Sequence, residues 1–169
     1  YKRSETIKNK TLKLLNDYSI DKKRITIFVA NKEEETIYKN SLQDEYKIVV
    51  GVPTIGKQRN FIEKYYKEGT RLKVKAQLVD VVDLEKEVFY KGFETCEMIN
   101  AKTFGIYAAS NPYFMKNRIY TKICYIIASM FGVIVEHDPF LERVTNHGED
   151  YEYSIRQYIK NKALITHLP

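Results

Sequence analysis

Two adjacent carboxylates follow a glycine late in the chain, in the run Asn146-His147-Gly148-Glu149-Asp150. A carboxylate at the start of a helix can remove a proton from a hydroxyl nucleophile, which makes Glu149 and Asp150 candidates for a general base. Acidic residues also stabilise the first turn of a helix by complementing its dipole, so a purely structural role fits the same pattern. Because neighbours on a helix point about 100° apart, only one of the two can face a given substrate.

A second group of candidate residues lies in the segment 51–60, which leads from the end of an expected strand through Gly56 into a helix. Free backbone N–H groups at a helix start suit a phosphate, and Arg59 can add a two-pronged contact to it. The segment has neither the Gly-Lys-Ser/Thr ending of a Walker A loop nor a G-x-G-x-x-G pattern. A plain turn before a capped helix is therefore the alternative interpretation.

Charged and metal-binding side chains occur at two further places. Lys2 and Arg3 form a basic pair that suits a diphosphate, although a solvated chain terminus fits the same residues. His137 precedes Asp138, and a histidine beside a carboxylate can be a metal ligand with its orienting partner. A hydrogen-bonded turn is the commoner role of such a pair, and the same applies to His147 and His167.

Composition limits the class of protein. The chain has 169 residues, which fits one domain, and its net charge of +6 favours a polyanionic partner such as DNA, RNA or a nucleotide phosphate. Lysines interspersed with acids are equally typical of an ordinary solvated surface. No apolar run approaches the roughly 20 residues that span a bilayer, so we expect no membrane partner. Two cysteines are too few for a disulfide framework, and reduced thiols in the cytoplasm or nucleus are expected.

Helices and strands are expected to alternate in the first half of the chain. A helix begins at Ser4, and a second, capped by Asn31, follows a strand over 24–30. A strand over 46–52, a helix over 57–68 and a strand over 71–79 come next. This order predicts a parallel α/β sheet with helices on both faces and ligands at the carboxyl ends of its strands. Tyr1–Arg3 would be the end of a first strand that is mostly missing, from a trimmed chain or one segment of a longer one.

The second half shows a different order. A helix over 85–100, a short strand over 103–108, a helix over 148–161 and a short strand over 162–166 are expected. Periodicity leaves residues 118–136 open between two strands and a buried helix. With no repeat or linker, the sequence predicts a single domain, residues 1–169, with a mixed sheet whose parallel part comes from residues 1 to 80.

Several segments, taken in order along nearly the whole chain, resemble the TET-associated glycosyltransferase family, a GT-A-fold group found in viruses, phages and some eukaryotes. The most specific are Gln58–Ile62 (QRNFI) and Phe104–Tyr107 (FGIY). The remaining segments are Tyr1–Thr6, Ile27–Ala30, Tyr46–Gly51, Gly56–Lys57, Ala101–Thr103, Asn111–Met115 and Glu149–Glu152.

The resemblance implies a GT-A-like fold and a nucleotide-sugar donor, such as a UDP-sugar. The donor would be bound by Lys2, Arg3, Gly56, Gln58, Arg59 and Asn60. Asp150 matches the acid of the family pattern and would be the catalytic base, with Glu149 as its partner. Hydroxymethylated pyrimidines in DNA are acceptors for some members, and a virus-infected host cell is an implied setting.

One departure concerns the metal. The family holds a divalent cation, Mn²⁺ or Mg²⁺, with a run of aspartates at the end of the fourth strand. Here that place reads LVDVVD over 78–83, where only Asp80 matches and Leu78 and Val79 offer no oxygen ligand. A weakened metal site, or neutralisation of the diphosphate by Lys2, Arg3 and Arg59, would fit. A GT-A-fold module without catalysis, whose basic surface binds nucleic acid or a partner protein, is the alternative.

Overall fold

The computed structural model describes residues 4–74, 83–106, 119–126, 130–163 and 165–166. The chain divides into two compact units, residues 1–62 and 63–169, and each unit has its own β-sheet. Over the described residues, no helix is both long enough and apolar enough to pass through a lipid bilayer. The mixed α/β class expected from the sequence is confirmed, whereas the single-domain interpretation stays a prediction.

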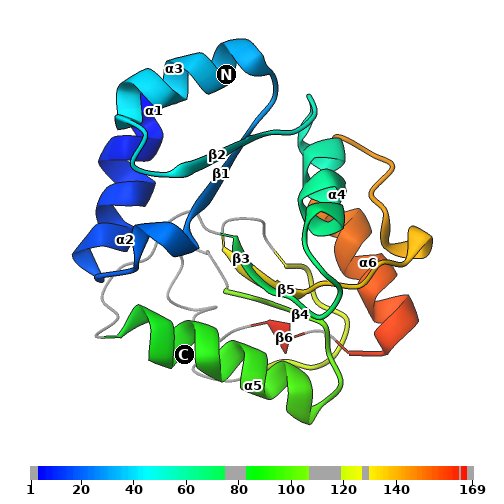
Figure 1. Ribbon diagram of the computed structural model, residues 1–169. Coiled ribbons are helices and arrows are strands. Elements are labelled where there is room, and N and C mark those ends of the chain that lie inside the picture. The colour runs from blue at the N-terminus through cyan, green and yellow to red at the C-terminus, as the bar shows by residue number, and fades with distance from the viewer. Residues whose placement is uncertain (1–3, 75–82, 107–118, 127–129, 164, 167–169) are drawn as a thin grey trace. The chain divides into compact units, whose positions relative to one another are not determined.

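The first unit contains a short parallel sheet. Strands β1 (Thr26–Val29) and β2 (Lys47–Val50) lie side by side (Figure 1), with Thr26 opposite Lys47 and Val29 opposite Val50. The parallel pairing predicted from the sequence is therefore confirmed. The helical elements of this part are α1 (Ser4–Thr6), the π-helical η1 (Ile7–Leu12), α2 (Lys13–Asp17), the 3-10 turn η2 (Lys22–Arg24), α3 (Lys32–Leu42) and the start of α4 (Ile55–Tyr65).

Both faces of this two-stranded sheet are covered. On one face Ile27 and Val29 are buried against Leu12 of the first helical segment and Leu42 of α3. On the other face the ring of Phe28 meets the ring of Phe61 of α4 edge to face, with centroids 6.1 Å apart. Apolar side chains on both faces are what a parallel strand beneath helices requires.

The second unit is built on a four-stranded mixed sheet in the order β3-β5-β4-β6. β3 and β4 each pair with β5 in antiparallel orientation, and β4 pairs with β6 in parallel. Its elements are β3 (Arg71–Val74), the π-helical η3 (Leu84–Tyr90), α5 (Lys91–Met98), β4 (Thr103–Gly105), β5 (Phe131–Ile134), the 3-10 turn η4 (Pro139–Leu141), α6 (Glu149–Asn161) and β6 (Ile165–Thr166).

One expectation about the sheet is wrong. The sequence order suggested that the strand beginning at Arg71 would extend the parallel sheet, but β3 pairs antiparallel with β5. The reason is that residues 131–134, which periodicity left open between strand and helix, form a strand and offer β3 an edge. Residues 1–3 and 75–82, the expected strand end and the rest of the third strand, lie outside the described residues.

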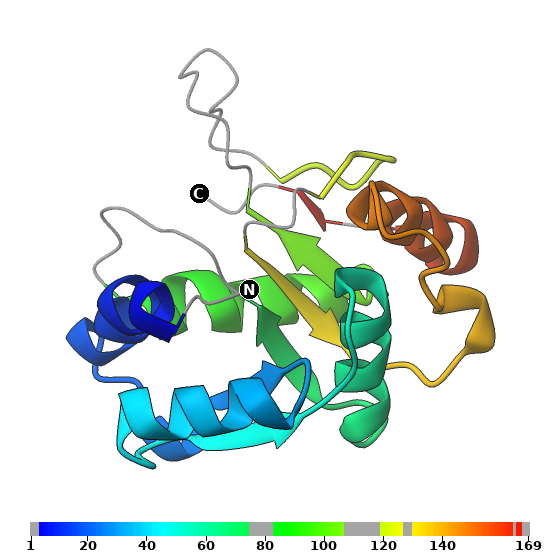
Figure 2. The ribbon, with the colours of Figure 1, turned by 90° about the horizontal axis from the view of Figure 1, so that it is seen from above.

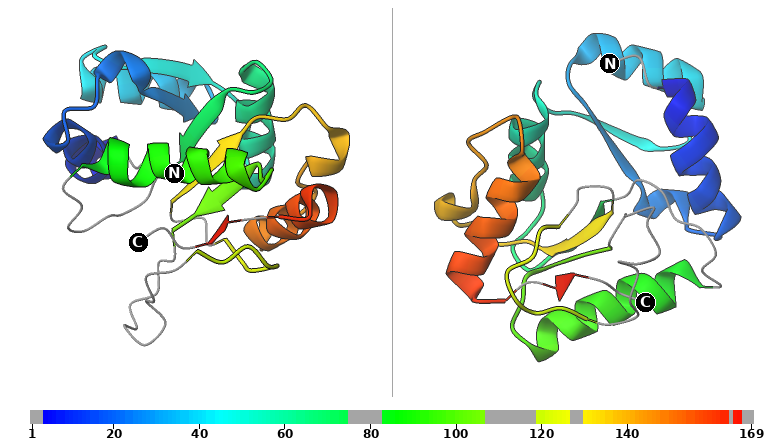
Figure 3. Two further views of the ribbon diagram at one scale, coloured as in Figure 1. Left: turned by 90° about the horizontal axis from the view of Figure 1, so that it is seen from below. Right: turned by 180° about the vertical axis from the view of Figure 1, so that it is seen from behind.

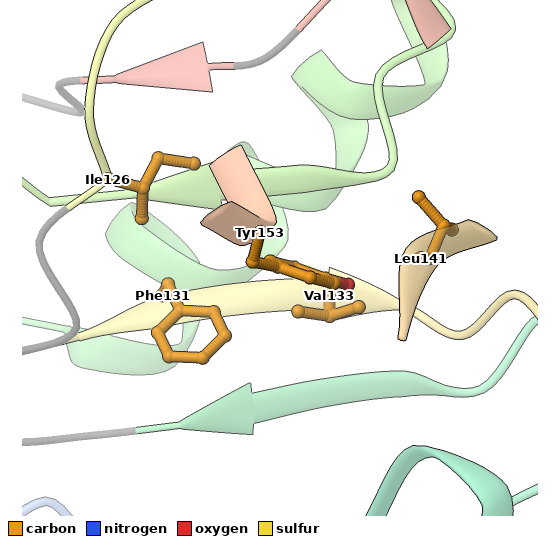
Figure 4. Packing of buried hydrophobic residues seen from close by; sticks show 5 residues of the cluster. All are labelled: Ile126, Phe131, Val133, Leu141 and Tyr153. Atoms are coloured by element: carbon orange, nitrogen blue, oxygen red, sulfur yellow. The ribbon is translucent and has the colours of Figure 1, made fainter. Parts of the chain in front are cut away.

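Helices cover both faces of the four-stranded sheet (Figures 2 and 3). On the α5 side, the fully buried ring of Phe104 meets the ring of Phe93 edge to face at 5.0 Å. On the α6 side, Phe131 and Val133 pack with Tyr153 (Figure 4). Strand alternation explains this arrangement, because Gly132, between Phe131 and Val133, faces Phe104 on the opposite side.

We expect Gly132→Ala to destabilise the second unit. The glycine lies opposite Phe104, and a Cβ at position 132 would collide with that ring. Overpacking of this kind costs about 1–3 kcal/mol in the free energy of unfolding, measurable by denaturant titration. Adding Phe104→Leu to the variant should recover part of the loss, because the smaller side chain gives the methyl group room. Equal stability of Gly132→Ala and the native chain would contradict this packing.

Candidate functional site

The acidic candidates lie at the start of α6, where Gly148 turns the chain into the helix. Gly148 has φ of 68°, in the left-handed region that glycine adopts without strain. The next two side chains diverge: Glu149 is buried, with 5% of its surface exposed, whereas Asp150 is half-buried. The two carboxylates therefore occupy different environments, as the helical geometry requires.

Glu149 belongs to a buried ion cluster centred on Arg143. The Arg143 guanidinium lies 2.9 Å from Glu63 Oε1, in the last turn of α4, and 3.6 Å from Glu149 Oε2. Its central carbon sits 3.5 Å from the centroid of the Tyr153 ring, a cation–π contact. Arg143 is only 4% exposed, so the cost of removing its charge from water must be offset by these partners. Glu149 is thus held as a structural counter-ion at the helix start.

The cluster continues along α6 as a chain of hydrogen bonds. The Tyr153 hydroxyl donates to Glu63 at 3.5 Å and accepts from the Gln157 amide at 2.9 Å. Asn161 donates to both Gln157 and Glu136. Burial is the main cause that raises the pKa of Tyr153, and the nearby Glu63 adds to it, so the hydroxyl remains a donor. These contacts tie the buried face of α6 to its surroundings over about two turns, from Tyr153 to Asn161.

Glu152, in the first turn of α6, also makes structural contacts. Its carboxylate accepts from the backbone N–H groups of Val144 and Thr145 and from the Thr145 hydroxyl at 2.8–3.1 Å. Arg156, one helical turn later, also contacts it at 2.7 Å. Burial opposes the charge of Glu152, but the hydrogen bonds from Thr145, Val144 and Arg156 outweigh burial and lower its pKa to about 2. Glu152 therefore fastens the loop before α6.

Asp150 has a different set of contacts. Its Oδ2 accepts from the hydroxyl of Tyr125 at 3.1 Å, and its Oδ1 accepts from the N–H of Tyr151 at 3.0 Å. The rings of the two tyrosines stack, with centroids 3.6 Å apart and an angle of 8° between them. A carboxylate oxygen can accept more than one hydrogen bond. Half-buried Asp150 is therefore held by two uncharged donors, whereas buried Glu149 lies beside the Arg143 guanidinium.

The ends of the two parallel strands are joined by Gln58. Its Oε1 accepts from Val52 N–H at 2.7 Å, and its Nε2 donates to the Val29 carbonyl at 3.3 Å. Gly51 N–H donates to the same carbonyl at 2.8 Å. A Cβ at Gly51 would collide with the Gln58 amide, so the glycine allows the approach. The structure shows a positioning role for Gln58 that the sequence did not reveal, and contact with a donor stays a prediction.

The two helices that follow these strands begin differently. α3 is capped by its own side chains, since Asn31 accepts from Glu34 N–H and the Glu34 carboxylate accepts from Ala30 N–H, each at 2.9 Å. In α4 the first helical bond runs from Gln58 N–H to the Thr54 carbonyl. Amides of the first turn, such as that of Gly56, point away from the helix and need acceptors elsewhere. Arg59 and Asn60, both half-buried, follow in the same helix.

The proposed metal ligands gain no support from the geometry. His137 is exposed, and its Nε2 lies 2.9 Å from the Tyr66 carbonyl. Within the described part of the chain, no three histidine, cysteine or acidic side chains converge as a cation would need. Asp80, like Lys2 and Arg3, lies outside the described residues. The described side chains therefore do not fit Mg²⁺ or Mn²⁺.

The two cysteines are free thiols. Burial raises the pKa of Cys96 to about 12, and the nearby Lys102 and Arg71 only partly oppose this rise. A thiol that stays protonated is a poor nucleophile, so Cys96 is a packing residue of α5.

We expect Glu152→Gln to remove an acid-sensitive part of the stability. The pKa falls from 4.5 to about 2 on folding, so the carboxylate stabilises the fold above pH 4.5 and loses this effect as the pH drops toward 2. The variant should lose about 1–3 kcal/mol at pH 7 and show a shallower decline in acid. Glu94→Gln, at an exposed site on α5, is the matched control. Identical acid profiles for both variants would contradict the assignment.

Comparison with family models, curated proteins and solved structures found no match to the chain.

Proposed function

We propose that this chain is a glycosyltransferase of the GT-A kind, which moves a sugar from a nucleotide-sugar donor to a hydroxyl group. The observation that carries the proposal is the separation of the acids at the start of α6. Glu149 and Glu152 make structural contacts with charged and backbone groups, whereas Asp150 is half-buried and accepts hydrogen bonds from two neutral donors. A carboxylate kept in this way suits the removal of a proton from an acceptor hydroxyl.

The first unit supports the donor half of the proposal. β1 and β2 run parallel, and the segment after β2 leads directly into the amino end of α4. Ligands of open parallel sheets bind at this end of the strands, and the helix start favours phosphate oxygens. Arg59, with Lys2 and Arg3 from the basic pair, would neutralise the diphosphate. The GT-A fold is also part of this proposal, and the mixed α/β architecture is compatible with it.

The chemistry is a displacement at the anomeric carbon of the sugar. Asp150 accepts the proton of the acceptor hydroxyl while that oxygen forms the new bond to carbon. The bond from carbon to the diphosphate oxygen breaks, and its electron pair leaves with the nucleoside diphosphate. In this proposal, stabilisation of the leaving group is assigned to the basic side chains of Lys2, Arg3 and Arg59. The net charge of +6 suits DNA as the polymer that carries the acceptor hydroxyl.

A non-catalytic module with the same fold is the competing function. It is favoured by Leu78 and Val79, which stand where the resembling family has metal-binding aspartates. Such a module would bind DNA with an affinity that falls with salt, and it would release no nucleoside diphosphate from any nucleotide sugar.

We expect Asp150→Asn to abolish most sugar transfer. Loss of a general base lowers a rate by about 10²–10⁴-fold, and the amide keeps the size of the side chain. The measurement is release of nucleoside diphosphate from a panel of nucleotide sugars, in the presence of DNA containing hydroxymethylated pyrimidines.

Calorimetric titration with UDP provides the controls. Asp150→Asn should bind UDP as tightly as the native chain and melt at nearly the same temperature. Arg59→Ala should bind it roughly 10- to 100-fold more weakly, since a charge-assisted contact contributes about 1.5–3 kcal/mol. Lower thermal stability in Asp150→Asn, with turnover per folded molecule unchanged, would reduce Asp150 to a helix-start residue. Absence of heat with every nucleoside diphosphate would leave only the non-catalytic module.

A further inference from the structure

We infer that Tyr125 is a positioning residue for Asp150, whose carboxylate it orients by a hydrogen bond from its phenol hydroxyl. The inference rests on the proposed function, because it concerns the base of that reaction. Tyr125 and Asp150 are distant in sequence, and their contact at 3.1 Å is made by side chains alone.

The carboxylate of Asp150 is oriented from two sides. Its Oδ1 accepts from the backbone N–H of Tyr151 at 3.0 Å, and its Oδ2 accepts from Tyr125 at 3.1 Å. The torsion that turns an aspartate carboxylate is broad and roughly two-fold, so a single contact leaves the group loosely defined. Two donors from different segments restrict that torsion. Removal of the Tyr125 hydroxyl would leave only the Tyr151 N–H of these two donors.

Tyr125 is itself held in place by three features of α6. Its ring stacks on that of Tyr151 with centroids 3.6 Å apart. The next residue, Ile126, is buried in the core cluster and donates its N–H to the Ser154 hydroxyl at 3.2 Å. Ser154 in turn donates to the Asp150 carbonyl at 2.8 Å. The segment 125–126 is therefore fixed to the same helical turn that carries the carboxylate.

The hydroxyl of Tyr125 is a persistent donor. Burial, followed by its contacts with Tyr151 and Asp150, raises the pKa of the Tyr125 phenol well above its usual range. The phenol therefore stays protonated at physiological pH, and its hydroxyl donates a hydrogen bond to the Asp150 carboxylate. The hydroxyl of Tyr153 has different partners from that of Tyr125, because it contacts Glu63 and Gln157 in the buried cluster.

The test compares Tyr125→Phe with Tyr153→Phe, which each remove one hydroxyl and keep the ring. We expect Tyr125→Phe to lower kcat by about 10- to 100-fold, since small misplacement of a catalytic group has effects of this size. Its KM for the donor should stay unchanged, and its melting temperature should fall less than that of Tyr153→Phe. Tyr153→Phe should melt earlier while keeping native turnover per folded molecule. Native kcat in Tyr125→Phe would overturn the inference while leaving the proposed function intact.

A second readout needs no turnover. At neutral pH, the ¹³C chemical shift of the Asp150 carboxyl carbon should change in Tyr125→Phe and stay in place in Tyr153→Phe. An unchanged shift in Tyr125→Phe would show that the hydrogen bond does not orient the carboxylate, and would overturn the inference. Failure of the native chain to transfer any sugar would instead refute the proposed function, and with it any catalytic role of this contact.

Discussion

The buried guanidinium of Arg143 is the interaction on which the start of α6 depends. Removing a charge from water is expensive, and the cost is offset only when partners of opposite charge and good geometry surround it. Here Glu63 and Glu149 supply the charges and the face of the Tyr153 ring covers the guanidinium. Because Glu149 is the first residue of the helix and Glu63 lies in α4, the cluster fixes where α6 begins and which of its faces is buried.

The burial of Glu149 beside Arg143 also determines where the neighbouring acidic side chains lie. With Glu149 turned inward, Asp150 must point about 100° away, and it meets Tyr125 at the edge of the core. Glu152 turns toward the preceding loop and holds Val144 and Thr145. Three acids within four positions thus reach three different surroundings. The same sequence feature serves both the stability of the helix and, by our proposal, the removal of a proton.

Local patterns in the sequence predicted the local structure well. The helix over 149–161, the cap at Asn31 and the parallel pair β1–β2 follow from periodicity, capping residues and strand order. Partners distant along the chain could not be predicted: β3 was assigned to the wrong sheet, and no local signal links Arg143 to Glu63. Tyr125 was missed because its segment gave no clear periodicity. For Gln58 the resemblance suggested a ligand contact, and only the fold revealed its two backbone partners.

A double-mutant cycle between Arg143 and Glu149 tests the central claim most directly. The free energy of unfolding would be measured for Arg143→Met, Glu149→Gln and the double variant. We predict that Arg143→Met alone costs about 3–5 kcal/mol, because it leaves buried carboxylates without their cation. The double variant should be more stable than the sum of the single losses by at least about 1 kcal/mol. Additive losses would contradict the account, since they would show that Arg143 does not hold the start of α6 through Glu149.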